Sequence, residues 1–557
     1  MLKRCESIAH HENHVDRRSY EPVAAPRQRI EKETLMRWHR LIIGLLIIIG
    51  AARFAILLMS QTHVHSDEAI IGLMGKHILE ARYFPFYMYG QPYNAGAAWE
   101  AYLAAIAFAL FGVSVISLKG CIVVLSLLAL FLFYRMCLAL YDQRTALLAT
   151  IVFALTPSLL KWHFQVRGYS WYFLSIPLLT ILFLWIQSSP DGKWPLLLLF
   201  GIVSGLNIWS LELGIAFTAA LWLLLLLRRG LSFKNALVAL IGLIVGYLPA
   251  IAFNLAHQFA NWTAVLEKTA GGGLGVLFRS NALWQIFVIE MPKFFGVDTI
   301  LWYYPQKSTS GVIFYAIALV ATGVAAWPFI RSPSRIAAAV RGGFLSAYEE
   351  RDLLLLVLIM ACFIPYVTAP FRVPGYFLAG CFFFAALTGR LIARCFASSK
   401  ALIRLGGIGV LAVIVITGTA LMIETARHNQ IETLTACDHG ENYCMTRIPG
   451  ADLEGVERDL RHRDVAGVWT TVSFVYPLLF ECGETFAVSD TIFGYQHRVY
   501  PAAIPWREPK PQEHFAIVIE SDSPFRAPLE ARFLQVTGVA PLINEYGKLA
   551  IIEAKPR

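Results

Sequence analysis

The chain has 557 residues and a formal net charge of +9, and 57% of its residues are hydrophobic while only 15% are charged. Soluble globular proteins carry about 25% charged residues, so this composition, with a mean hydropathy of +0.57, excludes a soluble globular chain and indicates an integral membrane protein. Much of the positive charge lies near the N-terminus and in short loops between apolar runs, which excludes nucleic-acid binding as its purpose and fits the positive-inside rule.

The first 40 residues form a polar segment that precedes the first apolar run. A segment this long and this polar does not fit the n-region of a cleavable signal peptide, and its composition is typical of disorder. We therefore expect residues 1–40 to be a disordered tail. Its basic residues place the tail in the cytoplasm: Arg27, Arg29, Lys32, Arg37 and Arg40.

The first apolar run, Leu41–Met59, is long enough to cross a bilayer as a helix. The sequence QTHVHSDEAIIGLMGKHIL follows it and places His63, His65, Asp67 and Glu68 at the mouth of this span. Adjacent carboxylates are costly to hold near lipid, so they indicate a functional site. Asp67 and Glu68 are therefore the candidate catalytic residues.

The sequence leaves two other roles open for these side chains. Ser66 or Asp67 can cap the helix predicted to begin here, with acids in its first turn, and such a cap is compatible with catalysis. His65 and Asp67, together with His63, have a spacing that can converge on a divalent metal ion. Interfacial histidines without a ligand are the more common case, so no cofactor is required and a divalent metal stays an alternative.

A shorter apolar stretch, Ala97–Gly112, carries Glu100 and closes the first external loop, residues 60–117. Because it is short for a span, we expect it to lie in the membrane plane as a re-entrant or interfacial helix. If it crossed instead, every later loop would change sides and the basic loops would lie outside. Glu100 is then either a buried structural group or a second acid that faces the site.

Further apolar runs follow that are compatible with membrane-spanning helices. They are Leu118–Tyr134, Ala146–Leu160, Tyr172–Gln187, Pro195–Ser210, Leu213–Leu227, Asn235–Phe253, Gly311–Ile330, Leu353–Thr368, Pro374–Leu391 and Leu402–Ile423. One set of the loops between them is basic and falls on the cytoplasmic side if the chain starts inside. We therefore predict about eleven spans, with the N-terminus inside and the C-terminus outside.

Two of the predicted external loops carry cations against the positive-inside trend. Lys161 and Arg167 lie in KWHFQVRGY, and Arg372 lies in PFRVPGY. An arginine offers a planar fork that matches phosphate oxygens, and a lysine offers a compact charge. Interfacial anchoring is the alternative for the arginines, and Lys161 is more typical of a snorkelling span end. A third external loop, residues 254–310, holds GGGLG and an aromatic stretch, a pattern that favours a mobile lid.

The composition becomes ordinary beyond residue 424. VAGVWTTV, TFAVSD, FAIVIE and KLAIIEAK are short, rich in β-branched and aromatic residues, and typical of strands, and Asp452–Arg463 is a plausible helix. We therefore predict a transmembrane domain over residues 41–424 and a small extracytoplasmic α/β domain over residues 425–557. Cys437 and Cys444 in that domain are close enough in sequence to form a disulfide, although the spacing alone is weak evidence.

The acids and cations are expected to meet at one face of the membrane. This arrangement suits a substrate with an anionic phosphate and a lipid tail, because the cations hold the phosphate leaving group while a carboxylate deprotonates an incoming hydroxyl. A positioned general base contributes roughly 10²–10⁴-fold, and stabilising the charge on the departing phosphate is the larger contribution. No glycine-rich phosphate loop precedes a helix, so a nucleotide is not expected.

The pattern HSDEAIIGLMGKHILEARYFPFYMYGQPY…EAYLAAIAFALFG, with YRMCLALYDQRTALLATIVFALTPSLL, resembles the GT-C superfamily of polytopic glycosyltransferases. It is most similar to bacterial members of the dolichyl-phosphate-mannose protein mannosyltransferase and aminoarabinose transferase group. The resemblance implies an α-helical polytopic membrane fold with membrane-plane helices in the first external loop. It also implies a small α/β extracytoplasmic domain and sugar donors carried on polyprenyl phosphate.

The same resemblance assigns roles to particular residues. Asp67 matches the catalytic acidic position of the family and Glu68 completes the pair, while Arg167 and Arg372 fall where basic residues face the carrier phosphate. The remaining candidate substrate contacts are Glu100, Lys161, Tyr93 in the GQPY segment and Tyr169 beside Arg167.

We therefore predict a glycosyltransferase of the cytoplasmic membrane that moves a sugar from a polyprenyl-phosphate carrier to a hydroxyl acceptor on its outer face. The acceptor is a protein, a lipid or a glycan, and the external C-terminal domain is expected to recognise it. A transporter or flippase is the first alternative, but it predicts charges near the bilayer midplane and repeated halves, which this sequence lacks. A non-catalytic envelope assembly protein is the second, and the intact acidic loop argues against it.

Overall fold

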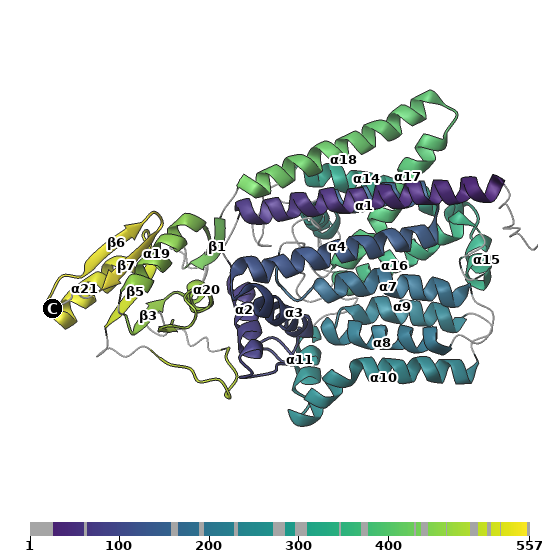
Figure 1. Cartoon of the computed structure of the whole chain (residues 1–557). Coiled ribbons are helices and arrows are strands. Elements are labelled where there is room, and N and C mark those ends of the chain that lie inside the picture. The colour runs from purple at the N-terminus through teal and green to yellow at the C-terminus, as the bar shows by residue number, and fades with distance from the viewer. Residues whose placement is uncertain are drawn as a thin grey trace, which may run out of the picture. The chain divides into compact units, whose positions relative to one another are not determined.

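The computed structural model describes most of the chain (Figure 1). The described residues are 26–60, 64–156, 165–188, 194–227, 232–270, 284–295, 309–342, 344, 347–368, 377–427, 430–435, 444–463, 465–490, 499–508, 514–523 and 525–553. They belong to two compact units, residues 1–47 and 48–557. The first unit contributes the start of helix α1 (Pro26–Ser60), which therefore begins within the segment expected to be a disordered tail.

The second unit is mostly helical as far as residue 427. Its helices are α2 (Ser66–Leu79), α3 (Ala95–Phe111), α4 (Val115–Leu140), α5 (Gln143–Leu155), α7 (Ser170–Gln187), α8 (Trp194–Ser210), α9 (Gly214–Leu227), α10 (Phe233–Ala256), α11 (Ala260–Thr269), η2 (Gln285–Glu290), α13 (Met291–Phe295), α14 (Thr309–Arg331), α15 (Ser334–Gly342), α16 (Tyr348–Thr368), α17 (Leu378–Ala397) and α18 (Ala401–Arg427). Each apolar run predicted to span the membrane corresponds to one of these helices.

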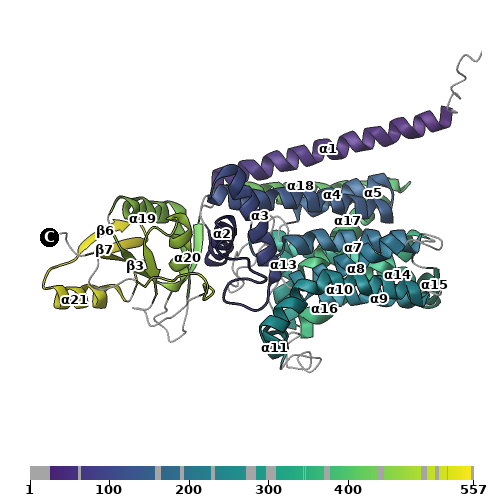
Figure 2. The ribbon, with the colours of Figure 1, turned by 60° about the horizontal axis from the view of Figure 1, so that its bottom comes forward.

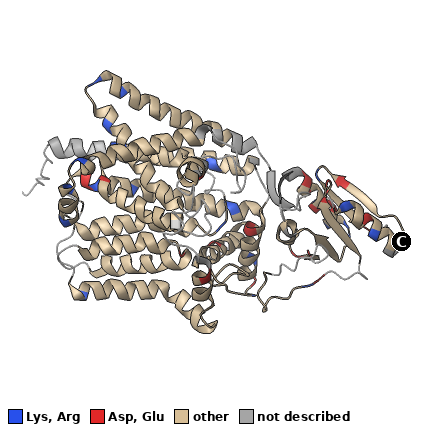
Figure 3. Ribbon diagram, turned by 180° about the vertical axis from the view of Figure 1, so that it is seen from behind, with Lys and Arg blue, Asp and Glu red and all other residues tan. Residues whose placement is uncertain are grey.

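The length and the apolar composition of its helices identify the protein as a multi-pass membrane protein. Of the described helices, 7 are long and apolar enough to cross a bilayer. Shorter apolar helices, α3, α5, α8 and α9, have between 10 and 17 residues. Lys, Arg, Asp and Glu are sparse along the long helices and gather near their ends and in the C-terminal part of the chain (Figure 3).

Local sequence signals set the ends of several helices. Ser114 precedes α4, and its Oγ accepts a hydrogen bond from the Ser117 N–H at 3.1 Å. Asp142 precedes α5, and its Oδ1 accepts from the Thr145 N–H at 2.9 Å. These side chains satisfy backbone donors that a helix leaves free in its first turn.

Helices α8 and α10 pack closely through glycine. A Cβ atom added at Gly205 would lie 2.2 Å from the Leu243 carbonyl oxygen, and one added at Gly246 would lie 2.1 Å from the Ile202 carbonyl oxygen. Gly201 and Gly242 face the opposite backbone at similarly short range. Glycines spaced four residues apart on both helices let the two backbones touch, as is common between helices in membranes.

The C-terminal part of the chain contains two sheets. A five-stranded sheet has the order β4 (Ala487–Ser489), β3 (Gly467–Thr470), β5 (Phe515–Glu520), β7 (Leu549–Glu553) and β6 (Leu542–Tyr546). Its β3 strand is parallel to β4 and β5, whereas β7 is antiparallel to β5 and β6. A separate antiparallel pair joins β1 (Gln430–Thr435) to β2 (Cys444–Pro449). The helices here are α19 (Gly450–His462), α20 (Val472–Glu481) and α21 (Arg526–Thr537).

The small α/β fold predicted from the sequence is confirmed, with one local correction. VAGVWTTV was expected to be a strand throughout, but β3 ends at Thr470 and α20 begins at Val472. Strands β1, β2 and β6 were not predicted. Cys437 lies outside the described residues, so the disulfide with Cys444 stays a prediction.

One hydrophobic core links the acidic-loop helices to the C-terminal sheet. Buried residues of α2, α3, α19, α20, β5 and β7 belong to the same cluster. Helices α2 and α20 lie side by side in both views (Figure 1, Figure 2), and the Phe108 and Phe480 rings lie 6.1 Å apart between α3 and α20. Helix α2, which carries the candidate catalytic acids, is therefore packed against the C-terminal domain.

Candidate functional site

The acidic loop ends in a capped helix. The His65 Nδ1 accepts a hydrogen bond from the Asp67 backbone N–H at 3.3 Å, and Glu68 Oε2 accepts from the His65 N–H at 3.0 Å. This reciprocal pair is a capping box in which histidine takes the place of the usual serine or threonine. The expectation that Ser66 or Asp67 would be the cap is therefore wrong, because His65 is the N-cap residue.

His65 can act as an acceptor because it is held neutral. Burial, and then the nearby positive charge of Arg167, lower the pKa of His65, against the opposing effect of Asp67 and Glu68. A neutral imidazole has one ring nitrogen that accepts a hydrogen bond, and here Nδ1 accepts from the backbone. His65 is therefore engaged in the fold of the loop.

Glu68 is a buried and fully engaged carboxylate. Its Oε1 accepts a hydrogen bond from the Val166 N–H at 3.1 Å, and its Oε2 lies 3.3 Å from the Lys119 Nζ. Burial acts to raise the pKa of Glu68, but Lys119 and the backbone donors outweigh it, so the pKa lies below its usual range. Glu68 therefore stays ionised and holds α2, the start of α4 and the loop before α7 together.

Asp67 differs from its neighbour. It is half-buried, and its carboxylate accepts no hydrogen bond from any described residue, although its backbone N–H donates to His65. Of the two adjacent acids, Asp67 is thus the one whose carboxylate is available to accept a proton.

Glu100 is buried in α3 and binds a loop that is distant in sequence. Its Oε2 accepts a hydrogen bond from the Gly168 N–H at 2.7 Å, and its Oε1 accepts from the Ser170 N–H at 2.9 Å. Gly168 has φ +85°, and a Cβ atom added at Gly96 would lie 1.8 Å from the Gly168 carbonyl oxygen. Of the two roles left open by the sequence, these contacts favour the structural one, in which Glu100 fixes the backbone on either side of Tyr169.

Arg167 lies in the loop that Glu68 and Glu100 hold. Its charge acts on both His65 and Glu68, while its Nε and Nη2 atoms are buried and have no hydrogen-bond partner among the described residues. The indole Nε1 atoms of Trp99 and Trp171 are also buried without partners, and their rings meet edge to face at 4.8 Å. Among the described residues, buried N–H donors without partners thus occur in this loop at Arg167, in α3 at Trp99 and in α7 at Trp171, and N–H donors of this kind can bind an anion.

The other predicted site residues fall into two groups. Lys161, Arg372 and His63 lie outside the described residues. Tyr93, shortly before α3, and Tyr169, directly before α7, are half-buried. Their roles stay predictions. Within the described ranges, no three His, Cys, Asp or Glu side chains converge as ligands for a metal ion, and the question of metal dependence stays open.

Lys119 is the site residue that the sequence reasoning missed. It lies in the first turn of α4, where it pairs with Glu68. In the sequence it resembles an ordinary cation at the end of a span. The available signal was its place at the predicted external end of α4, which breaks the positive-inside trend as Lys161 and Arg167 do.

Solved structures are similar to this protein, whereas searches with its sequence found no match. No family model matches the sequence, and no curated protein is significantly similar to it. ArnT from Cupriavidus metallidurans bound to undecaprenyl phosphate is similar in structure, with a TM-score of 0.58, 11% identity, and coverage of 93% of this chain and 99% of ArnT. Its apo form gives a TM-score of 0.54 with 11% identity, covering 94% of this chain and 100% of that one.

A third solved structure is more distant. The apo oligosaccharyltransferase of Archaeoglobus fulgidus gives a TM-score of 0.45 with 12% identity, over 80% of this chain and 64% of that one. The two ArnT structures show that this chain has a GT-C fold. The fold implied by the resemblance in sequence is thereby confirmed.

Proposed function

We propose that this polytopic protein with a GT-C fold is a membrane glycosyltransferase that moves a sugar from a polyprenyl-phosphate carrier to a hydroxyl acceptor. The Asp67 carboxylate carries the proposal, because it is half-buried, accepts no hydrogen bond from the described residues and acts, like Arg167, on the pKa of His65 in the acidic loop's cap. The fold supports a lipid-linked donor, since one ArnT structure with this fold is bound to undecaprenyl phosphate.

In the proposed reaction Asp67 is the general base. It takes the proton of the acceptor hydroxyl, whose oxygen forms a bond to the anomeric carbon of the donor sugar. The bond between that carbon and the phosphate oxygen breaks, and the polyprenyl phosphate leaves with the electron pair. Base catalysis by a positioned carboxylate contributes roughly 10²–10⁴-fold.

Arg167 is proposed to stabilise the departing phosphate. Its unpaired Nε and Nη2 donors support this role, since guanidinium groups bind phosphate oxygens through parallel N–H donors, and stabilising developing charge is a large catalytic effect. We infer that Arg372 completes the phosphate site and that Lys161, Tyr93 and Tyr169 contact the donor. Glu68 and Glu100 serve as supports that hold the loop of Arg167 against α2.

We infer that the reaction takes place on the outer face of the cytoplasmic membrane. The distribution of basic loops supports a cytoplasmic N-terminus and an extracytoplasmic C-terminal domain. Helix α3 is then a membrane-plane helix of the first external loop. The proposed acceptor is a protein, a lipid or a glycan.

Transfer of radiolabelled sugar from a mixed pool of polyprenyl-phosphate sugars tests the proposal. We expect membranes with the wild-type protein to transfer label and membranes with Asp67→Asn to transfer none, at equal expression. Glu349→Gln is the matched control, because it removes a partly exposed carboxylate, 3.9 Å from Arg394, from the first turn of another helix, α16, and should leave transfer unchanged. Equal transfer by wild type and Asp67→Asn would show that Asp67 is not the base, and no transfer by the wild type would contradict the proposed activity.

A further inference from the structure

Helix α20 of the C-terminal domain packs against the first part of α2, and the turn after α20 reaches the last turn of α2. Near the start of both helices, the Ser66 Oγ donates a hydrogen bond to the Ser473 carbonyl at 2.8 Å. In the middle, a Cβ atom added at Gly72 would lie 2.6 Å from the Phe480 ring. These contacts advance in the same direction along both segments. Helix α20 and the turn to Glu484, residues 472–484, which we call the splint, therefore run beside α2 from the end that carries Asp67 to its last turn.

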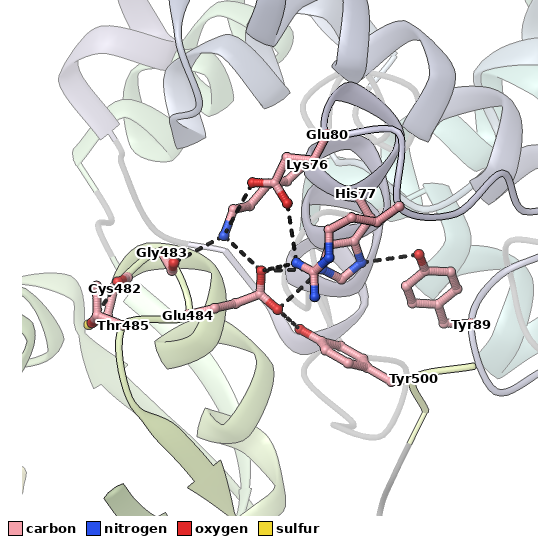
Figure 4. Close-up of polar contacts among 10 residues, drawn as sticks. Lys76, His77, Glu80, Tyr89, Cys482, Gly483, Glu484, Thr485 and Tyr500 are labelled. Atoms are coloured by element: carbon pink, nitrogen blue, oxygen red, sulfur yellow. Dashed lines mark hydrogen bonds and ion pairs between the residues drawn. The ribbon is translucent and has the colours of Figure 1, made fainter. Parts of the chain in front are cut away.

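The splint ends in a polar cluster centred on Glu484 (Figure 4). Glu484 Oε2 lies 2.7 Å from the Lys76 Nζ, and its Oε1 lies 3.1 Å from the His77 Nε2. The Tyr500 hydroxyl donates to Oε1 at 2.9 Å, and the Arg82 Nη1 approaches Oε2 at 3.5 Å. A single carboxylate therefore binds the last turn of α2, the loop after it and a tyrosine of its own domain.

His77 is enclosed by this cluster. Its side chain is fully buried, and its Nδ1 lies 3.1 Å from the Tyr89 hydroxyl while its Nε2 faces Glu484. The Tyr89 ring stacks on it at 5.9 Å, and the Tyr500 ring meets it edge to face at 5.3 Å. Both ring nitrogens thus have partners and two aromatic rings pack against the imidazole, which leaves the last turn of α2 little freedom to move.

The backbone conformation of Glu484 is unusual. Its φ is +60°, directly after Gly483 at +67°. Residues other than glycine rarely adopt this conformation, and such strain persists where surrounding contacts fix it, often at functional sites. Here the compensating contacts are those to Lys76, His77, Arg82 and Tyr500. The strained turn places the carboxylate where it reaches all four.

The charge of Glu484 is stable within the cluster. Burial acts to raise its pKa, but hydrogen bonds from His77 and Lys76 lower the pKa to about 2. The ion pair with Lys76 is largely shielded from water, with 14% and 15% of the two side chains exposed. Such a pair is screened less than one on an open surface.

We propose that Glu484 is a positioning residue of the transfer reaction, which fixes the far end of α2 and thereby sets the place of Asp67. The inference rests on the proposed function for its catalytic part. Ten residues of helix separate Asp67 from His77, about 15 Å along a rigid axis, so a tilt at one end displaces the other. The C-terminal domain thus helps to build the active site, beyond the acceptor recognition expected of it.

The test uses full-length protein with Glu484→Gly and Glu484→Gln. Glycine accepts φ +60° without strain, so Glu484→Gly removes the carboxylate and relieves the backbone at once, and misfolding is not expected to confuse the result. Glu484→Gln keeps one acceptor oxygen and should have a smaller effect. Glu545→Gln is the control, because it removes an acid of the same domain that pairs with Arg526 on the surface.

Two measurements separate positioning from simple stability. Hydrogen–deuterium exchange is expected to rise across residues 66–79 in Glu484→Gly and to stay unchanged in α8 and in the control variant. At saturating acceptor, we expect kcat to fall roughly tenfold to a hundredfold, since a displacement of about 1 Å has effects of that size. The KM for the donor should change by a smaller factor than kcat, because the proposed phosphate ligands are not themselves on α2, although Glu68 joins the loop of Arg167 to that helix.

Each outcome decides the inference. Unchanged exchange in α2, or an unchanged kcat, would overturn the role of Glu484, as would a large rise in donor KM with kcat preserved. If the wild-type protein transfers no sugar, the proposed function and the catalytic part of this inference fail together. The exchange measurement would then still decide whether Glu484 holds α2.

Discussion

Two helix pairs in this protein are held closely together, and they are held in different ways. Helices α8 and α10 pack through glycines on both sides, with backbone against backbone and no ion pair between them among the described contacts. Helices α2 and α20 also use a glycine, Gly72, but add a hydrogen bond near one end and the Glu484 cluster at the other. One pair is joined by shape alone and the other by shape and charge.

The difference follows from the surroundings and the task. Between apolar membrane helices there is little hydrophobic driving force, so close packing of small residues is what brings them together. Helix α2 carries the proposed catalytic acid, whose role requires accurate placement, and polar contacts at defined distances fix rotation and register better than apolar packing does. The α8–α10 pair therefore supports the bundle, whereas the α2–α20 pair supports the site.

The largest expected effect comes from breaking the pair that depends on shape. Gly205→Leu places a side chain where a Cβ atom alone would lie 2.2 Å from the Leu243 carbonyl oxygen. Backbone cannot give way as a flexible side chain can, so we expect loss of more than about 3 kcal/mol, the upper end of the usual overpacking cost, and loss of most folded protein. Size-exclusion chromatography and thermal unfolding in detergent measure this.

A matched substitution controls for leucine itself. A Cβ atom added at Gly409 in α18 would meet nothing within 4 Å, so Gly409→Leu should leave the yield and the unfolding temperature unchanged or slightly raised, as replacement of a helix glycine usually does. If both variants are equally stable, the α8–α10 contact is not as tight as the distances indicate.

The second prediction concerns the charge of Glu484, which stabilises the contact between α2 and the splint and has no counterpart among the described contacts of α8 with α10. The pKa of Glu484 is about 2 in the folded protein, against 4.5 for an unperturbed glutamate. A lowered pKa stabilises the folded state at pH values above the unfolded pKa, and this contribution is lost as pH falls through the folded pKa. The shift corresponds to about 3 kcal/mol at neutral pH.

Thermal unfolding of wild type and Glu484→Gln as a function of pH measures this contribution. We expect the difference in unfolding temperature to be constant above about pH 5, to shrink below it and to vanish near pH 2. If the difference in unfolding temperature between wild type and Glu484→Gln stays the same from about pH 6 to about pH 3, the charge of the carboxylate is not what stabilises the contact.

The helices of the bundle were predictable because their signal is local. A helix that crosses a bilayer needs about 20 apolar residues and makes its backbone hydrogen bonds within itself. Each such helix can therefore be recognised from its own apolar run. The splint was not predictable, since it joins Ser66 to Ser473, which are 407 positions apart. In sequence, Val472 continues a β-branched run and Glu484 follows a glycine, and neither indicates a partner in the acidic loop.

The candidate site was likewise predictable only in the part that rests on a local pattern. The position of Asp67 and Glu68 at the end of a span is a local pattern, and it is enough to single out this loop as the candidate site. The choice of His65 as the cap depends on burial and on Arg167, which lies in a different external loop. Lys119 is paired with Glu68 only through the fold. The side chains that complete the loop are therefore set by tertiary contacts that a sequence alone does not show.

The smallest expected effect comes from the apolar middle of the splint. In Gly72→Ala the new methyl group would lie 2.6 Å from the Phe480 ring. Because a ring can shift where backbone cannot, we expect a loss of about 1–3 kcal/mol and a fold that is retained. The variant should then lower kcat while the donor KM stays near the wild-type value, as α2 is pushed away from α20.

A second substitution tests this explanation directly. Phe480→Leu removes ring atoms at the point of contact, so the double variant Gly72→Ala/Phe480→Leu should recover part of the stability and part of the kcat that Gly72→Ala loses. The two effects are then not additive, as is expected of residues in contact. If the double variant shows only the sum of the two single losses, α2 and α20 do not touch at this point, and the splint would have to act through the Glu484 cluster alone.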